Sequence, residues 1–153
     1  MITVSDRSAS GDRADESGPA AAQALGDGGF EVSEPTVVPD DLTTIVTHLQ
    51  AAVATGFDLI VTTGGTGLGP RDVTPEAAAA VIERDVPGIP ELMRAAGARR
   101  TPMAALSRAR AGLAGASLIV NLPGSPKGVR ESLEILLPLL PHALEVVAGR
   151  DAH

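Results

Sequence analysis

The sequence of 153 residues contains no cysteine, and its aromatic side chains are limited to Phe30 and Phe57. The absence of thiols excludes disulfide bonds, thiolate zinc sites and thiol catalysis. The scarcity of aromatic rings argues against the stacking surfaces on which proteins bind single-stranded nucleic acid. The core must therefore be packed from leucine, isoleucine, valine and alanine.

Positive charge is also scarce. The formal net charge is −7, and Lys127 is the only lysine. Surfaces that follow a nucleic-acid backbone need a basic stripe, so we expect no nucleic-acid partner. No stretch approaches the roughly 18 consecutive apolar residues of a membrane span, and the start has no apolar signal segment. We expect a cytoplasmic protein with no membrane contact.

The length suits a single domain over residues 1–153. Segments rich in β-branched residues alternate with segments that carry helical start and stop signals. We predict strands at 2–6, 30–38, 57–63, 107–113 and 117–122. We predict a polar loop after the first strand and helices at 17–28, 39–56, from 74, 87–100 and 125–144. This alternation predicts an α/β fold, a three-layer αβα sandwich with a largely parallel central sheet.

Ligands of such sheets bind beyond the carboxyl ends of the strands. That rule selects the loops after Asp6, Thr63 and Leu122, together with the turn Pro39-Asp40-Asp41. The unusual residues of the chain lie in these four places, and we expect a site there.

The loop after Thr63 belongs to the stretch TTGGTGLGPRDVTPEA at 62–77. Its glycines at 64, 65, 67 and 69 leave backbone amides accessible, which can form an anion-binding concavity. It is not a Walker A loop, because Pro70-Arg71 stands where Lys-Ser/Thr is required. A long surface turn is the alternative interpretation, but four glycines beside the pair Arg71-Asp72 favour a site. Thr74 is predicted to cap the next helix.

The loop after Leu122 reads PGSPKG and predicts a helix with Ser125 as N-cap. Lys127 then stands in the first turn, where its charge opposes the helix dipole at a cost of a few tenths of a kcal/mol. A lysine and a helix N-terminus aimed at one spot would suit a bound anion. A solvated lysine on a first turn is the alternative.

Asp40 and Asp72 are the acidic candidates at this edge. Each also has an ordinary explanation, Asp40 as the N-cap of its helix and Asp72 as a turn residue. Spacing alone identifies neither residue as catalytic.

Taken in order, ITVSDR, VPDD, TTGGTG with RDVTPEA, and NLPGSPKG resemble the MogA/MoaB family of molybdenum-cofactor biosynthesis proteins, which includes the G domain of gephyrin. The resemblance covers nearly the whole chain. It implies a homotrimer that binds molybdopterin. In the enzymatic members it implies transfer of AMP from Mg-ATP to the terminal phosphate of the pterin, with pyrophosphate released. A further implied partner is a MoeA-like molybdenum insertase that receives the product.

The resemblance also implies roles for particular residues. Asp40 and Asp72 match the family's two catalytic acidic positions, and we expect them to hold Mg²⁺. The implied substrate-binding residues are Asp6, Arg7, Gly64, Gly65, Thr66, Gly67, Arg71, Pro123, Gly124, Ser125 and Lys127.

Three hypotheses of different kinds follow. The first is a molybdopterin adenylyltransferase, a nucleotidyltransferase. The second is a MoaB-like protein that binds molybdopterin with little or no adenylyl transfer. The third is an oligomerisation module, against which the density of candidate site loops argues. The presence of both Asp40 and Asp72 favours the enzyme.

Overall fold

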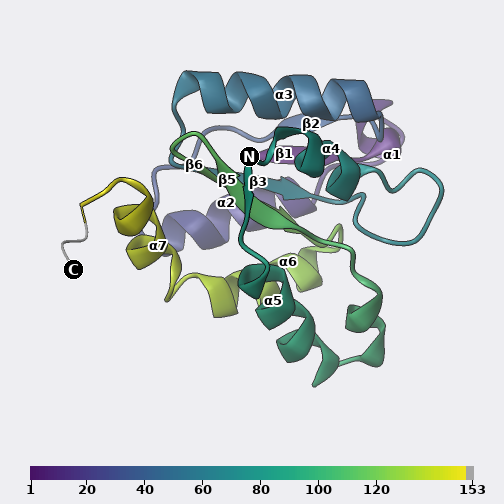
Figure 1. Ribbon diagram of the computed structural model, residues 1–153. Helices are drawn as coiled ribbons and strands as arrows, with labels where there is room; N and C mark the ends of the chain where they lie inside the picture. Colours follow the sequence, from purple (N-terminus) through teal and green to yellow (C-terminus); the bar gives the residue numbers. More distant parts are fainter. Residues whose placement is uncertain (151–153) are drawn as a thin grey trace.

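The computed structural model describes residues 1–150 as a six-stranded sheet with helices on both faces (Figure 1). Residues 151–153 of the predicted domain lie outside the described part. The strands are β1 (Ile2–Val4), β2 (Thr36–Val38), β3 (Leu59–Thr63), β4 (Arg84–Asp85), β5 (Ala111–Ala114) and β6 (Ser117–Leu122). The helices are α1 (Asp6–Ala9), α2 (Ser17–Asp27), α3 (Leu42–Thr55), α4 (Thr74–Val81), α5 (Gly88–Ala98), α6 (Pro126–Leu136) and α7 (Leu140–Val147), with a 3-10 helix η1 (Pro102–Leu106).

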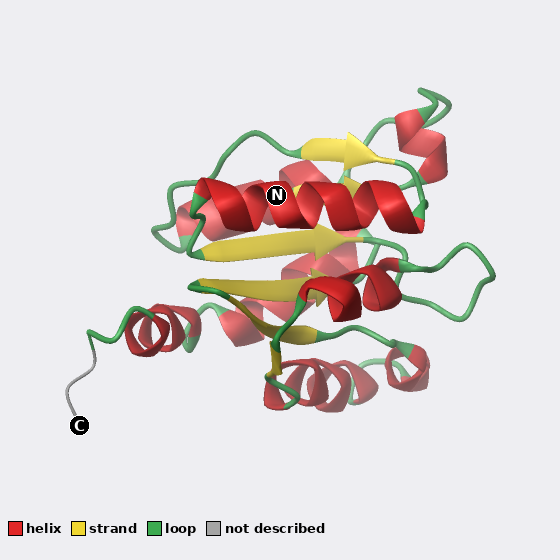
Figure 2. Ribbon diagram, turned by 45° about the horizontal axis from the view of Figure 1, so that its top comes forward, coloured by secondary structure: helices red, strands yellow, loops and turns green. Residues whose placement is uncertain are grey.

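The strand order is β2-β1-β3-β6-β5-β4. Pairing is parallel from β2 through β6 and antiparallel between β6, β5 and β4. One core cluster joins α3 and α4 to the sheet, and another joins α2, α5, α6 and α7 to it. Figure 2 shows the strands running between these two helical layers. The predicted three-layer αβα sandwich with a largely parallel sheet is confirmed.

The central strands explain why this sheet is stable. Every residue of β6 is buried, and β6 pairs with β3 over the whole length of β3. Strands covered on both faces need an apolar centre, which residues 59–61 and 118–120 provide. The buried polar residues Thr62 and Asn121 bond to each other at 3.0 Å. The buried side chains are mainly leucine, isoleucine, valine and alanine, as the composition predicts. Within residues 1–150, no helix has the length and apolar character to cross a bilayer.

Four of the five predicted strands are shorter than predicted; β1 ends at Val4, β3 begins at Leu59, and the other two lose more. The strand predicted at 30–38 forms only at Thr36–Val38, because β1 offers three residues for pairing. Phe30 packs against the core from outside the sheet. The strand predicted at 107–113 begins at Ala111, since the preceding residues form contacts with the glycine loop. The sequence patterns also missed β4 and η1.

The predicted final helix is in fact two helices. α6 ends at Leu136 and α7 begins at Leu140. Pro138 has no amide hydrogen to continue the helical ladder, whereas Pro141 lies in the first turn of α7, where proline is tolerated. Leu136 and Leu140 are both buried, so the apolar stripe survives the break.

The first polar loop holds more structure than predicted. Ser5 caps α1, its Oγ accepting a bond from the Ser8 amide at 3.2 Å. Ser17 is not the cap of α2; its amide and that of Gly18 both donate to Asp15 Oδ1 at 3.0 Å. The Asp15 carboxylate therefore satisfies the free amides at the start of α2.

At the carboxyl ends of β1, β3 and β6, the backbones of the three segments are in close contact. Gly64 has φ +89°, and a Cβ on it would overlap the carbonyl oxygen of Val4. A Cβ on Gly124 would lie 3.1 Å from Cα of Gly64. Thr74, predicted as a cap, is instead buried within α4 and donates its hydroxyl to the Gly64 carbonyl at 2.9 Å. The glycines therefore allow three loops to converge.

We expect Gly64→Ala to reduce the free energy of unfolding more than Gly29→Ala. Gly29 has φ +90°, and an added methyl group there would meet no atom within 4 Å, so its substitution isolates backbone strain of about 1–2 kcal/mol. The methyl at Gly64 also overlaps the Val4 carbonyl, which adds roughly 1–3 kcal/mol. Urea unfolding measures both variants, and equal losses would contradict the close approach.

Candidate functional site

The predicted site loops lie at one edge of the sheet. In Figure 1 the loop between β3 and α4 projects from this edge, beside α1 and the start of α4. The structure divides the predicted residues into a group of aspartates with Arg71 and a cavity lined by α5, η1 and α6. The glycine loop between β3 and α4 lies between the two parts.

Asp6 and Asp40 hold each other in place. The Asp6 amide donates to Asp40 Oδ2 at 2.8 Å, and the Asp40 amide donates to Asp6 Oδ1 at 2.9 Å. Asp40 is not the N-cap of α3. That position belongs to Asp41, whose Oδ1 accepts a bond from the Thr44 amide at 2.8 Å. The ordinary explanation of Asp40 is therefore wrong, and its carboxylate faces the site edge.

Arg71 is bound to Asp6 through two hydrogen bonds. Its Nε donates to Asp6 Oδ2 and its Nη2 donates to Asp6 Oδ1, each at 2.9 Å. These bonds are the main reason that the pKa of Asp6 is lowered. Both side chains are substantially exposed, so this two-point contact orients the groups more than it stabilises the fold.

Asp40 has the opposite shift. Burial is the main cause that raises its pKa, and the neighbouring charges of Asp6 and Asp72 add to it. The hydrogen bond from the Asp6 amide and the charge of Arg71 act against the rise. The ionised form of Asp40 is therefore disfavoured by its surroundings, a feature that often marks functional carboxylates.

Asp72 is enclosed by the glycine loop. Its Oδ2 accepts a bond from the Gly69 amide at 2.7 Å. A Cβ on Gly67 would lie 2.9 Å from this oxygen, and one on Gly69 would lie 2.8 Å from it. These two glycines leave room for the carboxylate in its present position and do not have positive φ.

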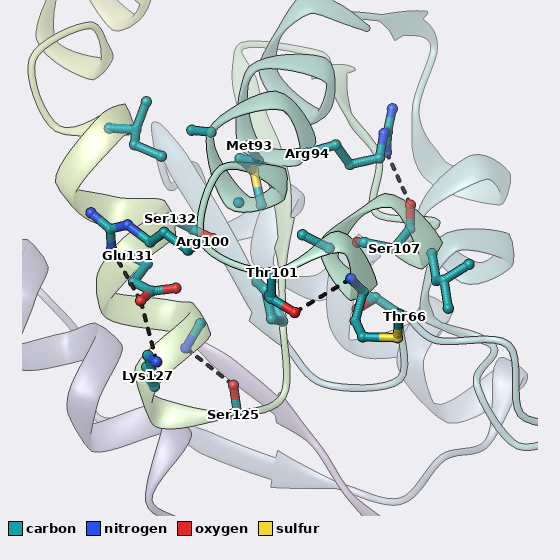
Figure 3. Close-up of a pocket in the computed structure, with 18 of the residues that line it drawn as sticks. Thr66, Met93, Arg94, Arg100, Thr101, Ser107, Ser125, Lys127, Glu131 and Ser132 are labelled. Carbon is teal, nitrogen blue, oxygen red and sulfur yellow. Dashed lines mark hydrogen bonds and ion pairs between the residues drawn. The ribbon is translucent and has the colours of Figure 1, made fainter.

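The second part is a cavity of about 390 Å³. Five predicted residues lie on its wall, namely Thr66, Gly67, Pro123, Ser125 and Lys127. The α5 and η1 side is largely apolar and includes Met103 and Met93, of which Met93 is labelled in Figure 3. A largely apolar pocket with a few polar groups at one end is typical of a small-molecule site.

The polar end of the cavity is the start of α6. Ser125 is the N-cap as predicted, and its Oγ accepts a bond from the Gly128 amide at 3.1 Å. Lys127 is 84% exposed, and its Nζ lies 3.9 Å from Glu131, too far for a hydrogen bond. Glu131 pairs more closely with Arg100, at 3.1 Å (Figure 3). The ammonium group is therefore only weakly held.

The structure brings most predicted residues together. A Cβ on Gly65 would lie 3.1 Å from Asp40 Oδ1, so the glycine loop contacts the aspartates on one side and lines the cavity on the other. Gly64 and Gly124 are in backbone contact. Arg7 is different, because its exposed side chain has no hydrogen bond or ion pair within residues 1–150. In that same range, no three acidic or histidine side chains form a group that could hold a metal alone.

Sequence reasoning missed Arg108, which contacts both ends of the glycine loop. It also missed Arg94, which binds the main chain on either side of Arg108. Neither residue stands in one of the motifs that carry the family resemblance. The sequence holds no signal that separates Arg108 from Arg110, which lies in the same segment predicted as a strand.

Residues 1–142 match the protein family described as a probable molybdopterin binding domain. The chain belongs to this family. Its fold and the clustering of its loops agree with the expectation from the resemblance.

Three known proteins illustrate what this member of the family is similar to. A molybdenum cofactor biosynthesis bifunctional protein from Synechococcus elongatus is 45% identical over 99% of this chain and 47% of its own length. A molybdopterin adenylyltransferase from Haemophilus influenzae is 41% identical over 88% of this chain and 70% of its own length. The crystal structure of the molybdopterin biosynthesis enzyme MoaB from Thermus thermophilus has a TM-score of 0.91 and 54% identity, covering 97% of this chain and 94% of that one. The chain spans about half the length of several curated relatives that it matches.

We expect Asp40→Asn to increase the free energy of unfolding at neutral pH. The folded-state pKa of Asp40 is raised, so its ionised form carries a penalty that disappears as pH falls below the usual value of 3.8. The gain from Asp40→Asn should therefore vanish in acid. Urea unfolding at several pH values measures it.

Asp41→Asn is the matched control with the opposite sign. Hydrogen bonds from Thr44 lower the pKa of Asp41, so the ionised form stabilises the fold above the usual value of 3.8. We expect this variant to lose stability at neutral pH and to approach the unsubstituted protein in acid. If both variants shift stability in one direction, the assigned environment of Asp40 is wrong.

Proposed function

We propose that this chain is a molybdopterin adenylyltransferase, a nucleotidyltransferase of molybdenum cofactor biosynthesis. It transfers AMP from Mg-ATP to the terminal phosphate of molybdopterin and releases pyrophosphate. The observation that carries the proposal is the glycine loop, which contacts Asp40 and Asp72 on one side and lines the cavity beside Lys127 on the other. The name of the Haemophilus influenzae relative supports the same activity.

The reaction requires two polyanions to approach each other. An oxygen of the molybdopterin phosphate attacks the α-phosphorus of ATP, a new P–O bond forms, and the bond to the bridging oxygen of pyrophosphate breaks. The second pKa of a phosphate monoester is about 6, so the nucleophile is already mostly dianionic at neutral pH and needs no general base. Catalysis then depends on positioning and on charge stabilisation.

Mg²⁺ fits the residues at this edge. Mg²⁺ at nucleotide sites is typically held by one or two carboxylates with substrate phosphates and waters, so a cage of three acidic residues is not needed. Within residues 1–150, the hydrogen bonds accepted by the Asp40 and Asp72 carboxylates go to Oδ2, and Oδ1 of each accepts none. Asp40 and Asp72 would hold the ion, which would neutralise phosphate charge. The protein itself would supply the amides of the glycine loop and Lys127.

The wider setting of the activity is also part of the proposal. The family resemblance supports a homotrimer in the cytoplasm, with molybdopterin and ATP as substrates. The adenylylated product is a mixed phosphate anhydride, so the next reaction must be one that uses an activated AMP group. A MoeA-like molybdenum insertase is the partner proposed for that step.

The second candidate is a MoaB-like protein that binds molybdopterin with little or no adenylyl transfer. The likeness to the Thermus thermophilus MoaB structure favours keeping it. Incubation with molybdopterin, ATP and Mg²⁺ separates the two, because only the enzyme releases pyrophosphate and forms adenylylated pterin. Molybdopterin binding without either product would select the second candidate.

We expect Asp72→Asn to reduce turnover by about 100-fold or more while molybdopterin affinity changes little. The amide oxygen of asparagine can still accept the bond from Gly69, so the loop keeps its shape, but the charge that would hold Mg²⁺ is lost. Asp85→Asn is the matched control, because Asp85 lies on the terminal strand β4 and pairs with Arg110. Loss of molybdopterin affinity instead of turnover would assign Asp72 to pterin binding.

We expect Lys127→Gln to raise the KM for a phosphate-bearing substrate by about tenfold, since it removes one charge-assisted bond. The same change should leave stability unaltered or raise it by a few tenths of a kcal/mol, because the lysine opposes the dipole of α6. Arg130→Gln removes an exposed cation from the same helix and is the control. Equal kinetic effects of the two variants would mean that Lys127 is an ordinary solvated lysine.

A further inference from the structure

Arg108 binds the glycine loop at both of its ends. Its backbone amide donates to the Thr66 carbonyl at 2.9 Å, and its Nε donates to the Gly67 carbonyl at 2.7 Å. Its Nη2 donates to the carbonyl of Asp72, and its Nη1 pairs with Glu76 in the first turn of α4. One side chain therefore connects the start of the loop, the end of the loop and the helix that follows.

Arg108 is itself held by a second arginine. Arg94 of α5 donates from Nη1 to the carbonyls of Ser107 and Ala109, each at 3.2 Å. Figure 3 shows the Arg94 side chain reaching Ser107 at the cavity wall. The two carbonyls flank Arg108, so α5 fixes the backbone from which the Arg108 side chain extends.

We propose that Arg108 is the positioning residue that aligns Asp72 with the cavity, a role that rests on the function proposed above. Thr66, Gly67 and Ser107 line the cavity, and each either bonds to Arg108 or precedes it in the chain. A ligand in the cavity would contact Thr66 and Gly67, whose carbonyl groups accept hydrogen bonds from Arg108. The same Arg108 side chain also donates a hydrogen bond to the main-chain carbonyl of Asp72.

Only a guanidinium group can make this set of contacts. Its donors lie in one plane and diverge, which allows Nε, Nη1 and Nη2 to reach three different oxygen atoms at once. A lysine has its donors on one nitrogen and cannot bridge the carbonyls of Gly67 and Asp72 in this way. The ion pair with Glu76 balances the charge, so Arg108 acts on the loop without adding a free cation for the substrate.

The loop depends on the contacts with Arg108 because its glycines contribute no side-chain packing that would hold the loop in one conformation. Gly67 and Gly69 have no side chains to pack, and Leu68 is 66% exposed. Glycine also has the most conformational freedom to lose on ordering. Without the Arg108 side chain, the loop keeps the two bonds between Gly69 and Asp72 and the pair of Arg71 with Asp6. Thr74 still bonds to Gly64 and Gly65 at the base of the loop. What is lost is the bridge from Gly67 to Asp72 and Glu76.

The test compares Arg108→Gln with Arg110→Gln. Arg110 lies two residues further along the same segment, and its side chain pairs with Asp85 at 2.9 Å, away from the loop. Both variants lose one cation of the same type. We expect Arg108→Gln to lower kcat by about 100-fold with a change in molybdopterin KM of less than about threefold, as expected for misplacement of a reacting group. We expect Arg110→Gln to stay close to the unsubstituted protein.

Hydrogen exchange gives a second readout that does not depend on turnover. We expect the amides of residues 66–72 to exchange at least about tenfold faster in Arg108→Gln and at the original rate in Arg110→Gln. If the Arg108→Gln variant does not fold, Arg108→Lys is measured in its place. It should show the same faster exchange and a kcat loss of at least about tenfold, because lysine keeps the charge without the divergent donors.

The outcomes separate this inference from the proposed function. If the unsubstituted protein transfers no AMP, the proposed function fails, and hydrogen exchange alone then decides whether Arg108 braces the loop. Equal exchange in the two glutamine variants overturns the positioning role. A rise in KM at unchanged kcat also overturns it, because Arg108 would then be a substrate-binding residue. Full activity of Arg108→Lys would show that charge alone is sufficient and would overturn it as well.

Discussion

The close approach of Gly64 to the ends of β1 and β6 is the constraint on which the site depends. A side chain at Gly64 would overlap the Val4 carbonyl, and one at Gly124 would crowd Gly64. The absence of both side chains lets the loops after three adjacent parallel strands share one edge. Asp6, Asp72 and Ser125 each follow one of these three strands, and Asp40 follows the neighbouring strand β2. The glycines therefore determine that groups distant in sequence meet at one place.

The sequence predicts the fold well where one kind of interaction dominates. The apolar runs of β3 and β6 and the stripe of α3 follow from burial alone, and these elements are confirmed. The errors occur where tertiary contacts override local preference. Ser17 and Thr74 look like caps, but the Ser17 hydroxyl bonds to the Thr63 hydroxyl and the Thr74 hydroxyl donates to the Gly64 carbonyl. Phe30 looks like part of the second strand, but β1, with which that strand pairs, is only long enough to pair with Thr36–Val38.

The candidate site shows the same division. The glycine and lysine loops can be identified because glycine repeats and a misplaced charge are local signals. Arg108 cannot be identified this way, because its importance lies in three acceptors at least 32 residues away in sequence. The distinction between Asp40 and Asp41 is likewise invisible in VPDD. It depends on the Asp6 amide, 34 residues away, which takes the carboxylate that a cap would use.

Charge pairing bears on how an acidic protein could accept the anionic substrates proposed for this edge. Arg71 is bound to Asp6, Arg108 to Glu76 and Arg100 to Glu131, so these guanidinium groups shape the site without remaining free. Lys127 differs, since it is highly exposed and its distance to Glu131 is 3.9 Å. It also lies at the amino end of α6, where the helix dipole favours a bound anion and disfavours the lysine alone. An anion at this position would satisfy both the ammonium group and the helix terminus, so a single binding event removes two unfavourable features of the free protein.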